Sequence, residues 1–167
     1  MSNRLRVAML SKASIVGIYQ RKLEEIARHD IELLALVPPY WRDERGKMPL
    51  ERTYTEGYQL DTLEMRLNGN FHFHFYRGLM RRLRAFKPHI LHIDEEPYNL
   101  AAWQAMLVAR RIKAKTVVFS WQNILRKYPM PFRWGERWVL RNTDALIAGT
   151  QSAADVWRAK GYRGTID

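Results

Sequence analysis

Three consecutive acidic residues, Asp94, Glu95 and Glu96, separate an apolar segment at 89–93 from an apolar helical pattern that begins near residue 99. Neighbouring carboxylates raise one another's pKa, which suits a base that takes a proton from a hydroxyl group. Carboxylates also accept hydrogen bonds from hydroxyl groups directly. A structural role is equally open, because an acidic residue can cap the next helix and complement its dipole. Both roles can apply to the same residues.

A second polar group, "SWQN" at 120–123, follows the apolar segment 115–120. Trp121 offers a flat apolar face, while Gln122 and Asn123 offer hydrogen-bond donors and acceptors. A tryptophan at such a position is also a common core residue. The loop "SKASIVG" after the first apolar segment contains a single glycine, Gly17. Glycine lets backbone amides approach an anion closely, but one glycine before a helix is more often a plain turn.

The segment "FHFHFY" at 71–76 alternates with a period of two and predicts an edge or half-buried strand. His72 and His74 would then share one face, but no third ligand lies nearby in the sequence, so we expect no metal site. The chain contains no cysteine. This excludes a disulfide scaffold and cysteine-based zinc sites, and it fits a reducing compartment such as the cytoplasm.

Short apolar runs alternate with helical patterns along most of the chain. Strands are predicted at 5–10, 31–37, 89–93, 115–120 and 144–149, and helices lie between them. Residues 40–70 are polar and are expected to be extended or loop structure. In the last helix, Ser152 and Asp155 have the spacing of a capping box, and Gly161 is placed to end the helix. The alternation predicts an α/β fold, a three-layer α/β/α domain with a mainly parallel sheet.

The predicted core of this sheet consists of apolar residues from all five strands. They are Val7, Ala8, Leu34, Leu36, Ile90, Ile93, Val117, Val118, Leu146 and Ile147. The acidic residues and "SWQN" both follow strands of this sheet, and parallel sheets bind ligands beyond the carboxyl ends of their strands.

The formal net charge of +11 predicts an anionic partner, with a solvated basic surface as the alternative. No recognised nucleic-acid motif is present, so we do not expect nucleic acid. No run of 18 apolar residues is present, so no membrane-spanning segment is predicted. Arginines recur at helical spacing in two stripes, and Trp134 and Trp138 accompany the second, which suits docking on anionic lipid. The stripes are Arg77, Arg81 and Arg84, and Arg133, Arg137 and Arg141.

Three longer stretches together resemble one family. They are "YQRKLEEIARHDIELLALVPPYW", "LRAFKPHILHIDEEPYNLAAWQA" and "VVFSWQNILRKYPMPFRWGERWVLRNTDALIAGTQSAADVWRAKGY". Their order and spacing are similar to the N-terminal half of a family 4, GT-B-type retaining glycosyltransferase. The resemblance implies that residues 1–167 are a Rossmann-like acceptor domain, one half of a GT-B fold. It also implies that the C-terminal donor domain is absent from this chain and that the chain alone transfers no sugar.

The resemblance further implies a site. Asp94 stands where relatives often carry a histidine near the reacting sugar, and is expected to bind hydroxyl groups before it transfers protons. Gly17 corresponds to the donor-proximal loop, where many relatives have paired glycines. The residues expected to bind the acceptor are Glu95, Glu96, Trp121, Gln122 and Asn123.

The implied substrates are a nucleotide sugar and a sugar or lipid-linked acceptor in cell-surface polysaccharide or glycolipid synthesis. Neither a cofactor nor a metal is expected. The resemblance supports a cytoplasmic protein that docks peripherally on the inner face of the membrane. The alternative is a non-catalytic nucleotide- or anion-binding Rossmann-like module.

Overall fold

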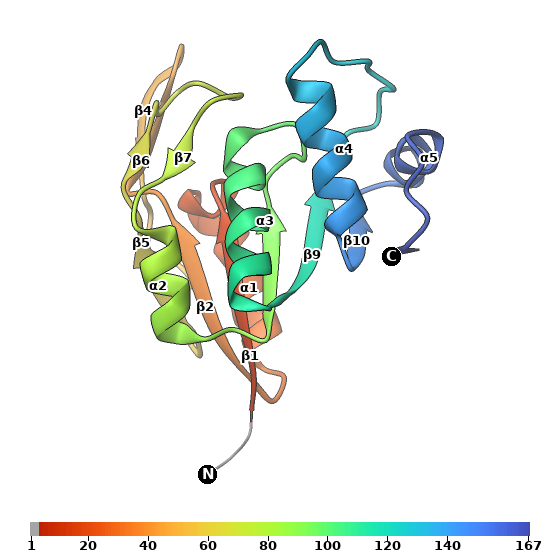
Figure 1. Cartoon of the computed structure of the whole chain (residues 1–167). Helices are drawn as coiled ribbons and strands as arrows, with labels where there is room; N and C mark the ends of the chain where they lie inside the picture. The colour runs from red at the N-terminus through yellow and green to blue at the C-terminus, as the bar shows by residue number, and fades with distance from the viewer. Residues whose placement is uncertain (1–3) are drawn as a thin grey trace.

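The computed structural model describes residues 4–167, in which strands alternate with helices except between α1 and α2, where six strands follow one another (Figure 1). The strands are β1 (Leu5–Ser11), β2 (Ile31–Val37), β3 (Tyr40–Asp43), β4 (Gly46–Pro49), β5 (Gln59–Thr62), β6 (Met65–Arg66), β7 (Phe75–Tyr76), β8 (Ile90–Asp94), β9 (Lys115–Ser120), β10 (Ala145–Ala148) and β11 (Thr165–Ile166). The helices are α1 (Gly17–Ala27), α2 (Leu79–Phe86), α3 (Leu100–Ile112), α4 (Phe132–Asn142) and α5 (Gln151–Ala159), with a 3₁₀ turn at Ala13–Ile15.

Seven strands form one sheet in the order β11-β10-β9-β8-β1-β2-β5. Every neighbouring pair in this sheet is parallel. The predicted α/β, Rossmann-like fold with a mainly parallel sheet is therefore confirmed. The chain moves outward from β1 in one direction through β2 and in the other through β8. The carboxyl ends of β1 and β8 thus flank the point where the topology reverses, which is where such sheets bind ligands.

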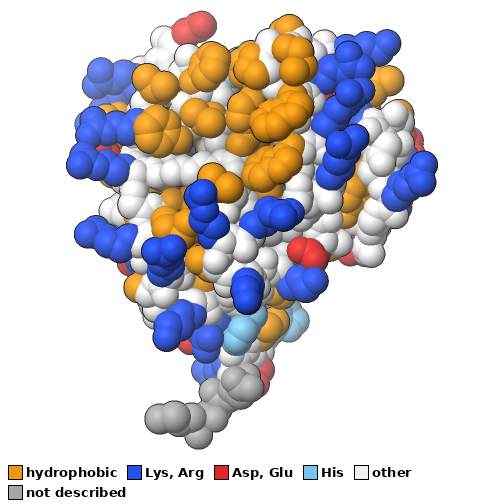
Figure 2. Space-filling view, viewed as in Figure 1, with side chains coloured by type: hydrophobic (Ala, Val, Ile, Leu, Met, Phe, Trp, Pro, Cys, Tyr) orange, Lys and Arg blue, Asp and Glu red, His pale blue; other side chains and the backbone are white. Residues whose placement is uncertain are grey.

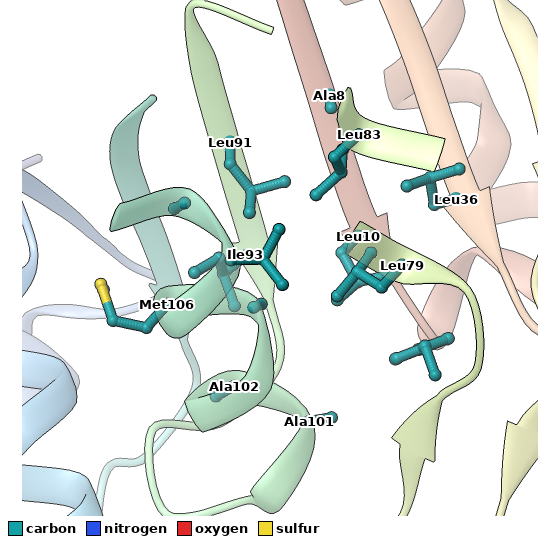
Figure 3. Close-up of a cluster of buried hydrophobic side chains, with 14 of the residues drawn as sticks. Ala8, Leu10, Leu36, Leu79, Leu83, Leu91, Ile93, Ala101, Ala102 and Met106 are labelled. Atoms are coloured by element: carbon teal, nitrogen blue, oxygen red, sulfur yellow. The ribbon is translucent and has the colours of Figure 1, made fainter. Parts of the chain in front are cut away.

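Side chains alternate between the two faces of the sheet, and each face has its own core. Leu10, Leu36 and Ile93 pack under α2 and α3, whose residues Leu79 and Ala102 meet them (Figure 3). On the other face, a smaller cluster packs beneath Leu23 of α1. Burying one Leu-sized side chain stabilises the fold by about 1.5–3 kcal/mol, so the larger cluster dominates.

The predicted core is confirmed in part. Six of its ten residues are buried: Ala8, Leu34, Leu36, Ile93, Val118 and Leu146. The other four, Val7, Ile90, Val117 and Ile147, are half-buried. They lie on the face of α1, whose apolar side chains pack on β1 and β2. Beyond α1, the side chains of β8, β9 and β10 border an open hollow of about 600 Å³.

Residues 40–70 are more ordered than the sequence predicted. They contain the β3–β4 hairpin, and β5 joins the main sheet beside β2. The strand predicted at 71–76 is wrong for its first half, because only Phe75–Tyr76 pairs, with Met65–Arg66. The side chain of Asn70 accepts hydrogen bonds from the backbone amides of His72 and Phe73. Such an Asx turn replaces the extended conformation.

The capping box predicted from Ser152 and Asp155 is also wrong. Thr150 is the N-cap of α5, and its hydroxyl accepts a hydrogen bond from the amide of Ala153 at 3.2 Å. Asp155 instead accepts a hydrogen bond from Gln151 within the helix. Gly161 does follow the helix end with a φ of +91°, as expected of a glycine that terminates a helix.

Within residues 4–167, no helix is both long enough and apolar enough to cross a membrane.

Candidate functional site

The three acidic residues lie at the carboxyl end of β8, as the sequence predicted, but their side chains have three different environments. Asp94 is the last residue of β8 and pairs in register with Ser11 at the end of β1. Glu95 and Glu96 follow in the turn that leads to α3. Each residue therefore has its own role.

Asp94 lies on the face of the sheet that α1 partly covers. Its Oδ2 accepts a hydrogen bond from the Ser11 hydroxyl at 2.6 Å and forms an ion pair with Lys22 at 2.9 Å. Among the residues described, none donates a hydrogen bond to its other oxygen, Oδ1. Asp94 also borders the open hollow of about 600 Å³, which we call the Asp94 hollow. The carboxylate is thus held in place with its side chain only 8% exposed, and within residues 4–167 its Oδ1 accepts no hydrogen bond.

Glu95 points into the protein, and its surroundings do not fit the predicted contact with an acceptor. Its side chain lies among buried residues, where Oε1 accepts from the Tyr76 hydroxyl at 2.7 Å and Oε2 contacts Nε2 of His74 at 3.2 Å. Nδ1 of His74 faces the carbonyl oxygen of Asn70 at 2.9 Å, so each ring nitrogen of His74 faces an oxygen acceptor.

The environment of Glu95 explains its ionisation. Burial alone would raise the pKa of Glu95, but the hydrogen bond and charge of His74, the charge of Lys12 and the hydrogen bond from Tyr76 together outweigh burial, so the pKa lies below its usual value. Burial raises the pKa of Tyr76 well above its usual value, and the nearby charge of Glu95 raises it further. Glu95 therefore anchors the β7 segment to the end of β8.

Glu96 bridges the ends of two neighbouring strands. Its Oε2 accepts from the Ser120 hydroxyl at 2.6 Å, and its Oε1 accepts from the backbone amide of Trp121 at 3.0 Å. Burial raises the pKa of Glu96, although both hydrogen bonds act in the opposite direction. The carboxyl group borders a second hollow of about 300 Å³, the Glu96 hollow, whose wall includes Tyr98 and Tyr128.

The "SWQN" residues adopt different positions. Trp121 is 61% exposed and borders both the Asp94 hollow and the Glu96 hollow. Its ring rests edge-on against Phe119, with centroids 5.6 Å apart. Asn123 is exposed in the wall of the Glu96 hollow. Gln122 is buried, and Lys160 donates to its Oε1 at 3.0 Å, so much of its hydrogen-bonding capacity is already used.

Gly17 lies at the start of α1, but its amide is already engaged. The amide donates to the carboxylate of Glu51 at 2.5 Å, and the side chain of Thr53 fills the space next to its Cα. A carboxylate of the chain itself therefore takes the hydrogen bond that this amide could otherwise give to a phosphate. This environment does not fit the donor-proximal role predicted for Gly17.

Several residues of the site were not predicted from the sequence. Ser11 and Lys22 contact Asp94, and Tyr98 and Tyr128 stack with centroids 4.5 Å apart in the wall of the Glu96 hollow. Ser11 directly follows the strand predicted at 5–10, and this position was a usable signal. Tyr128 had no such signal, because it comes from the loop between β9 and α4.

The arrangement suits a ring-shaped ligand that carries several hydroxyl groups. Trp121 supplies an exposed aromatic face, and Asp94 and Glu96 supply acceptors on either side of it. Residues 4–167 contain no group of three or more His, Asp or Glu side chains placed to hold a metal ion. His74 contacts Glu95, and His72 packs against Phe132 with centroids 4.9 Å apart.

Comparisons with known proteins agree with this fold. A family model described as "Glycosyl transferase 4-like domain" matches residues 20–165. A solved structure of UDP-N-acetylglucosamine 2-epimerase superimposes with a TM-score of 0.67 at 14% sequence identity. The match covers 98% of this chain and 47% of the epimerase chain, so this chain spans about half the length of that structure. No curated protein matches the sequence.

Proposed function

This chain belongs to the glycosyl transferase 4-like domain family, and on that premise we propose that it is the acceptor-binding N-terminal domain of a retaining, nucleotide-sugar-dependent glycosyltransferase. The acceptor is a sugar or a lipid-linked sugar used in cell-surface polysaccharide or glycolipid synthesis. The reaction in this proposal needs neither a metal nor a cofactor, and the nucleotide sugar is a substrate.

One observation carries the proposal. The exposed ring of Trp121, which directly follows β9, borders two hollows, and a carboxylate borders each hollow. A sugar ring that stacks on the indole places its hydroxyl groups toward Asp94 on one side and Glu96 on the other. Charge-assisted hydrogen bonds of this kind are roughly twice as strong as neutral ones.

The residues have distinct roles in this proposal. Asp94, fixed by Ser11 and Lys22, accepts a hydroxyl group at Oδ1. In this proposal Asp94 also orients the hydroxyl group that reacts. Glu96 and Asn123 bind further hydroxyl groups in the Glu96 hollow. Gln122 contributes mainly by holding the loop, because Lys160 and Tyr128 already contact its side chain.

The donor site lies outside this chain in the proposal. The amide of Gly17 is taken by Glu51, and the matched epimerase structure is about twice as long as this chain. In the proposal, a second domain that binds the nucleotide sugar completes the enzyme. The chain alone is expected to bind an acceptor without transferring sugar.

A titration tests this proposal on the chain as it is. We would add a panel of mono- and oligosaccharides, and separately nucleotide sugars, to ¹⁵N-labelled protein and follow the indole signal of Trp121 and the side-chain amide of Asn123. Trp121→Phe assigns the indole signal. We expect a saccharide to shift both signals saturably and nucleotide sugars to shift neither. Saturable binding of nucleotides at these residues, without saccharide binding, would favour the alternative of a non-catalytic nucleotide-binding module.

We further propose that the protein docks peripherally on an anionic membrane surface. Apolar side chains gather on the helical face, and Lys and Arg flank them (Figure 2). We define the aromatic patch as Phe71, Phe73, Met130, Phe132 and Trp134. Its members Met130 and Trp134 are 68% and 60% exposed, and Phe73 packs on Phe132 with centroids 5.3 Å apart. Such a patch with a cationic border suits insertion between charged lipid headgroups.

Vesicle sedimentation tests the docking proposal. We expect binding to vesicles that contain phosphatidylglycerol, with little binding to pure phosphatidylcholine. Met130→Ser with Trp134→Ser should weaken binding at least tenfold, whereas Ile18→Ser with Tyr19→Ser, exposed on α1, should change it less than twofold. Equal effects from the two variants would contradict the assignment of this patch.

A further inference from the structure

A basic hollow of about 570 Å³ lies between α4 and α5, and Lys160 in its wall donates to Gln122, which borders the Glu96 hollow. Its walls come from the second half of α4, the end of α5 and the segment 161–164. Four cationic side chains border it: Arg137, Arg141, Lys160 and Arg163. No carboxylate belongs to its wall among the described residues, and the volume falls in the range of about 300–1,000 Å³ typical of small-molecule sites.

Three of these cations lack a partner. Across residues 4–167, the guanidinium groups of Arg137, Arg141 and Arg163 form neither a salt bridge nor a hydrogen bond. Arg137 and Arg141 are one helical turn apart on α4, where like charges repel each other. Lys160 differs, because it forms an ion pair with the carboxylate of Glu136. The charges of Lys160 and Glu136 therefore offset each other.

The charge balance indicates the kind of ligand. The ends of α4 and α5 both lie in the wall, and each helix C-terminus carries roughly half a negative charge. Together they offset about one of the three unpaired positive charges, which leaves a surplus of about two. A phosphate monoester or a diphosphate carries a matching charge, and the guanidinium fork binds its oxygen atoms in pairs.

We infer that the basic hollow binds a ligand through a phosphate monoester or diphosphate group. The rest of the ligand extends along the groove, because the volume of the hollow exceeds the need of phosphate alone. The groove continues past Lys160 into a region bordered by Arg126, Lys127 and Arg133, and also by Glu136, the partner of Lys160. Arg126 and Tyr128 border both this region and the Glu96 hollow, but Trp121, Asp94 and Glu96 do not border the basic hollow, so the inference rests on the basic hollow alone.

The molecule offers a matched control. Another basic hollow, of about 510 Å³, lies between the ends of α2 and α3 and is bordered by Arg84, Arg111 and two lysines. It contains two guanidinium groups instead of three. We expect it to bind phosphate groups less well, because lysines lack the paired geometry of arginine. Removing two arginines from either hollow lowers the net charge of the protein by the same amount.

The test is a titration with inorganic pyrophosphate by calorimetry at low and at physiological salt. We expect saturable binding with a Kd below about 1 mM at low salt, weakened at least tenfold by Arg141→Gln with Arg163→Gln. Arg84→Gln with Arg111→Gln should change it less than twofold. Melting curves check that both variants fold, as expected for exposed arginines. Absence of saturable binding in the wild type, or equal weakening by both variants, would overturn the inference.

A second arm identifies the source of the phosphate group. Vesicles with phosphatidic acid are titrated with the protein in the presence and absence of pyrophosphate. One outcome is that pyrophosphate displaces the wild-type and control proteins from vesicles but has no such effect on the Arg141→Gln with Arg163→Gln variant. In that case the site binds a lipid headgroup. If pyrophosphate binds the hollow without affecting vesicle binding, the ligand is a soluble phosphate compound. Both results support the site, whereas loss of competition in the control variant would contradict it.

Discussion

Replacing Glu95 separates its structural role from a role in acceptor binding. Glu95→Ala removes the acceptor for two buried donors, the Tyr76 hydroxyl at 2.7 Å and Nε2 of His74 at 3.2 Å. With about 1.5–3 kcal/mol for each hydrogen bond to a charged group, we expect a loss of about 3–5 kcal/mol in the free energy of unfolding. For a chain of this length, such a loss lowers Tm by roughly 10 °C.

Glu95→Gln is the matched variant. Its amide oxygen can accept from the Tyr76 hydroxyl, and its amide nitrogen can donate to Nε2 of a neutral His74, so we expect a cost of only about 1 kcal/mol. Saccharide affinity should remain within twofold of wild type in this variant. Calorimetric melting and the saccharide titration measure the two effects. A Glu95→Ala protein that melts within 2 °C of wild type would refute the anchoring role, and a tenfold loss of affinity in Glu95→Gln would restore the predicted acceptor contact.

Three further predictions follow from other parts of the structure. In the complete enzyme, Asp94→Asn or Glu96→Gln should each lower the rate of sugar transfer at least tenfold, about 1.4 kcal/mol, with Tm nearly unchanged. Wild-type rates in both variants would show that Asp94 and Glu96 are not part of the site. Burial lowers the pKa of His92 to about 4, so between pH 6.5 and 4 His92 is protonated in the unfolded chain and neutral in the folded chain. The free energy of unfolding should therefore fall by about 3 kcal/mol as the pH decreases from 6.5 to 4. Denaturant titrations should show that His92→Leu lacks this slope. Gly135→Ala should lower stability by about 1–3 kcal/mol, since the new methyl group overlaps the ring of Trp103, and a melting curve that shows stabilisation would contradict this packing.

The sequence was sufficient to predict the parallel sheet because its inner strands are short apolar runs between helical patterns. It was not sufficient for β5, since Gln59–Thr62 lies at the edge of the sheet and is only partly buried. A strand that packs against one neighbour needs less apolar surface, so its pattern resembles a loop. β11 has two residues and therefore no detectable pattern.

The candidate site was predictable in position but not in detail. The strand ends located Asp94, Glu96 and Trp121 correctly at one edge of the sheet, because parallel strands end together. The direction of Glu95 was not predictable, since strand alternation stops at Asp94 and the next residue lies in a turn. Its partners come from a segment about 20 positions earlier, and only the folded chain brings His74 to it.

Sugar-transfer kinetics with Trp121→Ala in the complete enzyme test the central claim most directly. Loss of the exposed ring between the two hollows should raise the KM for the acceptor at least fivefold, about 1 kcal/mol, and leave the KM for the nucleotide sugar within twofold. The melting temperature should change little, because Trp121 is mostly exposed. A rise in the KM for the nucleotide sugar with an unchanged KM for the acceptor would contradict the assignment of this chain to the acceptor side.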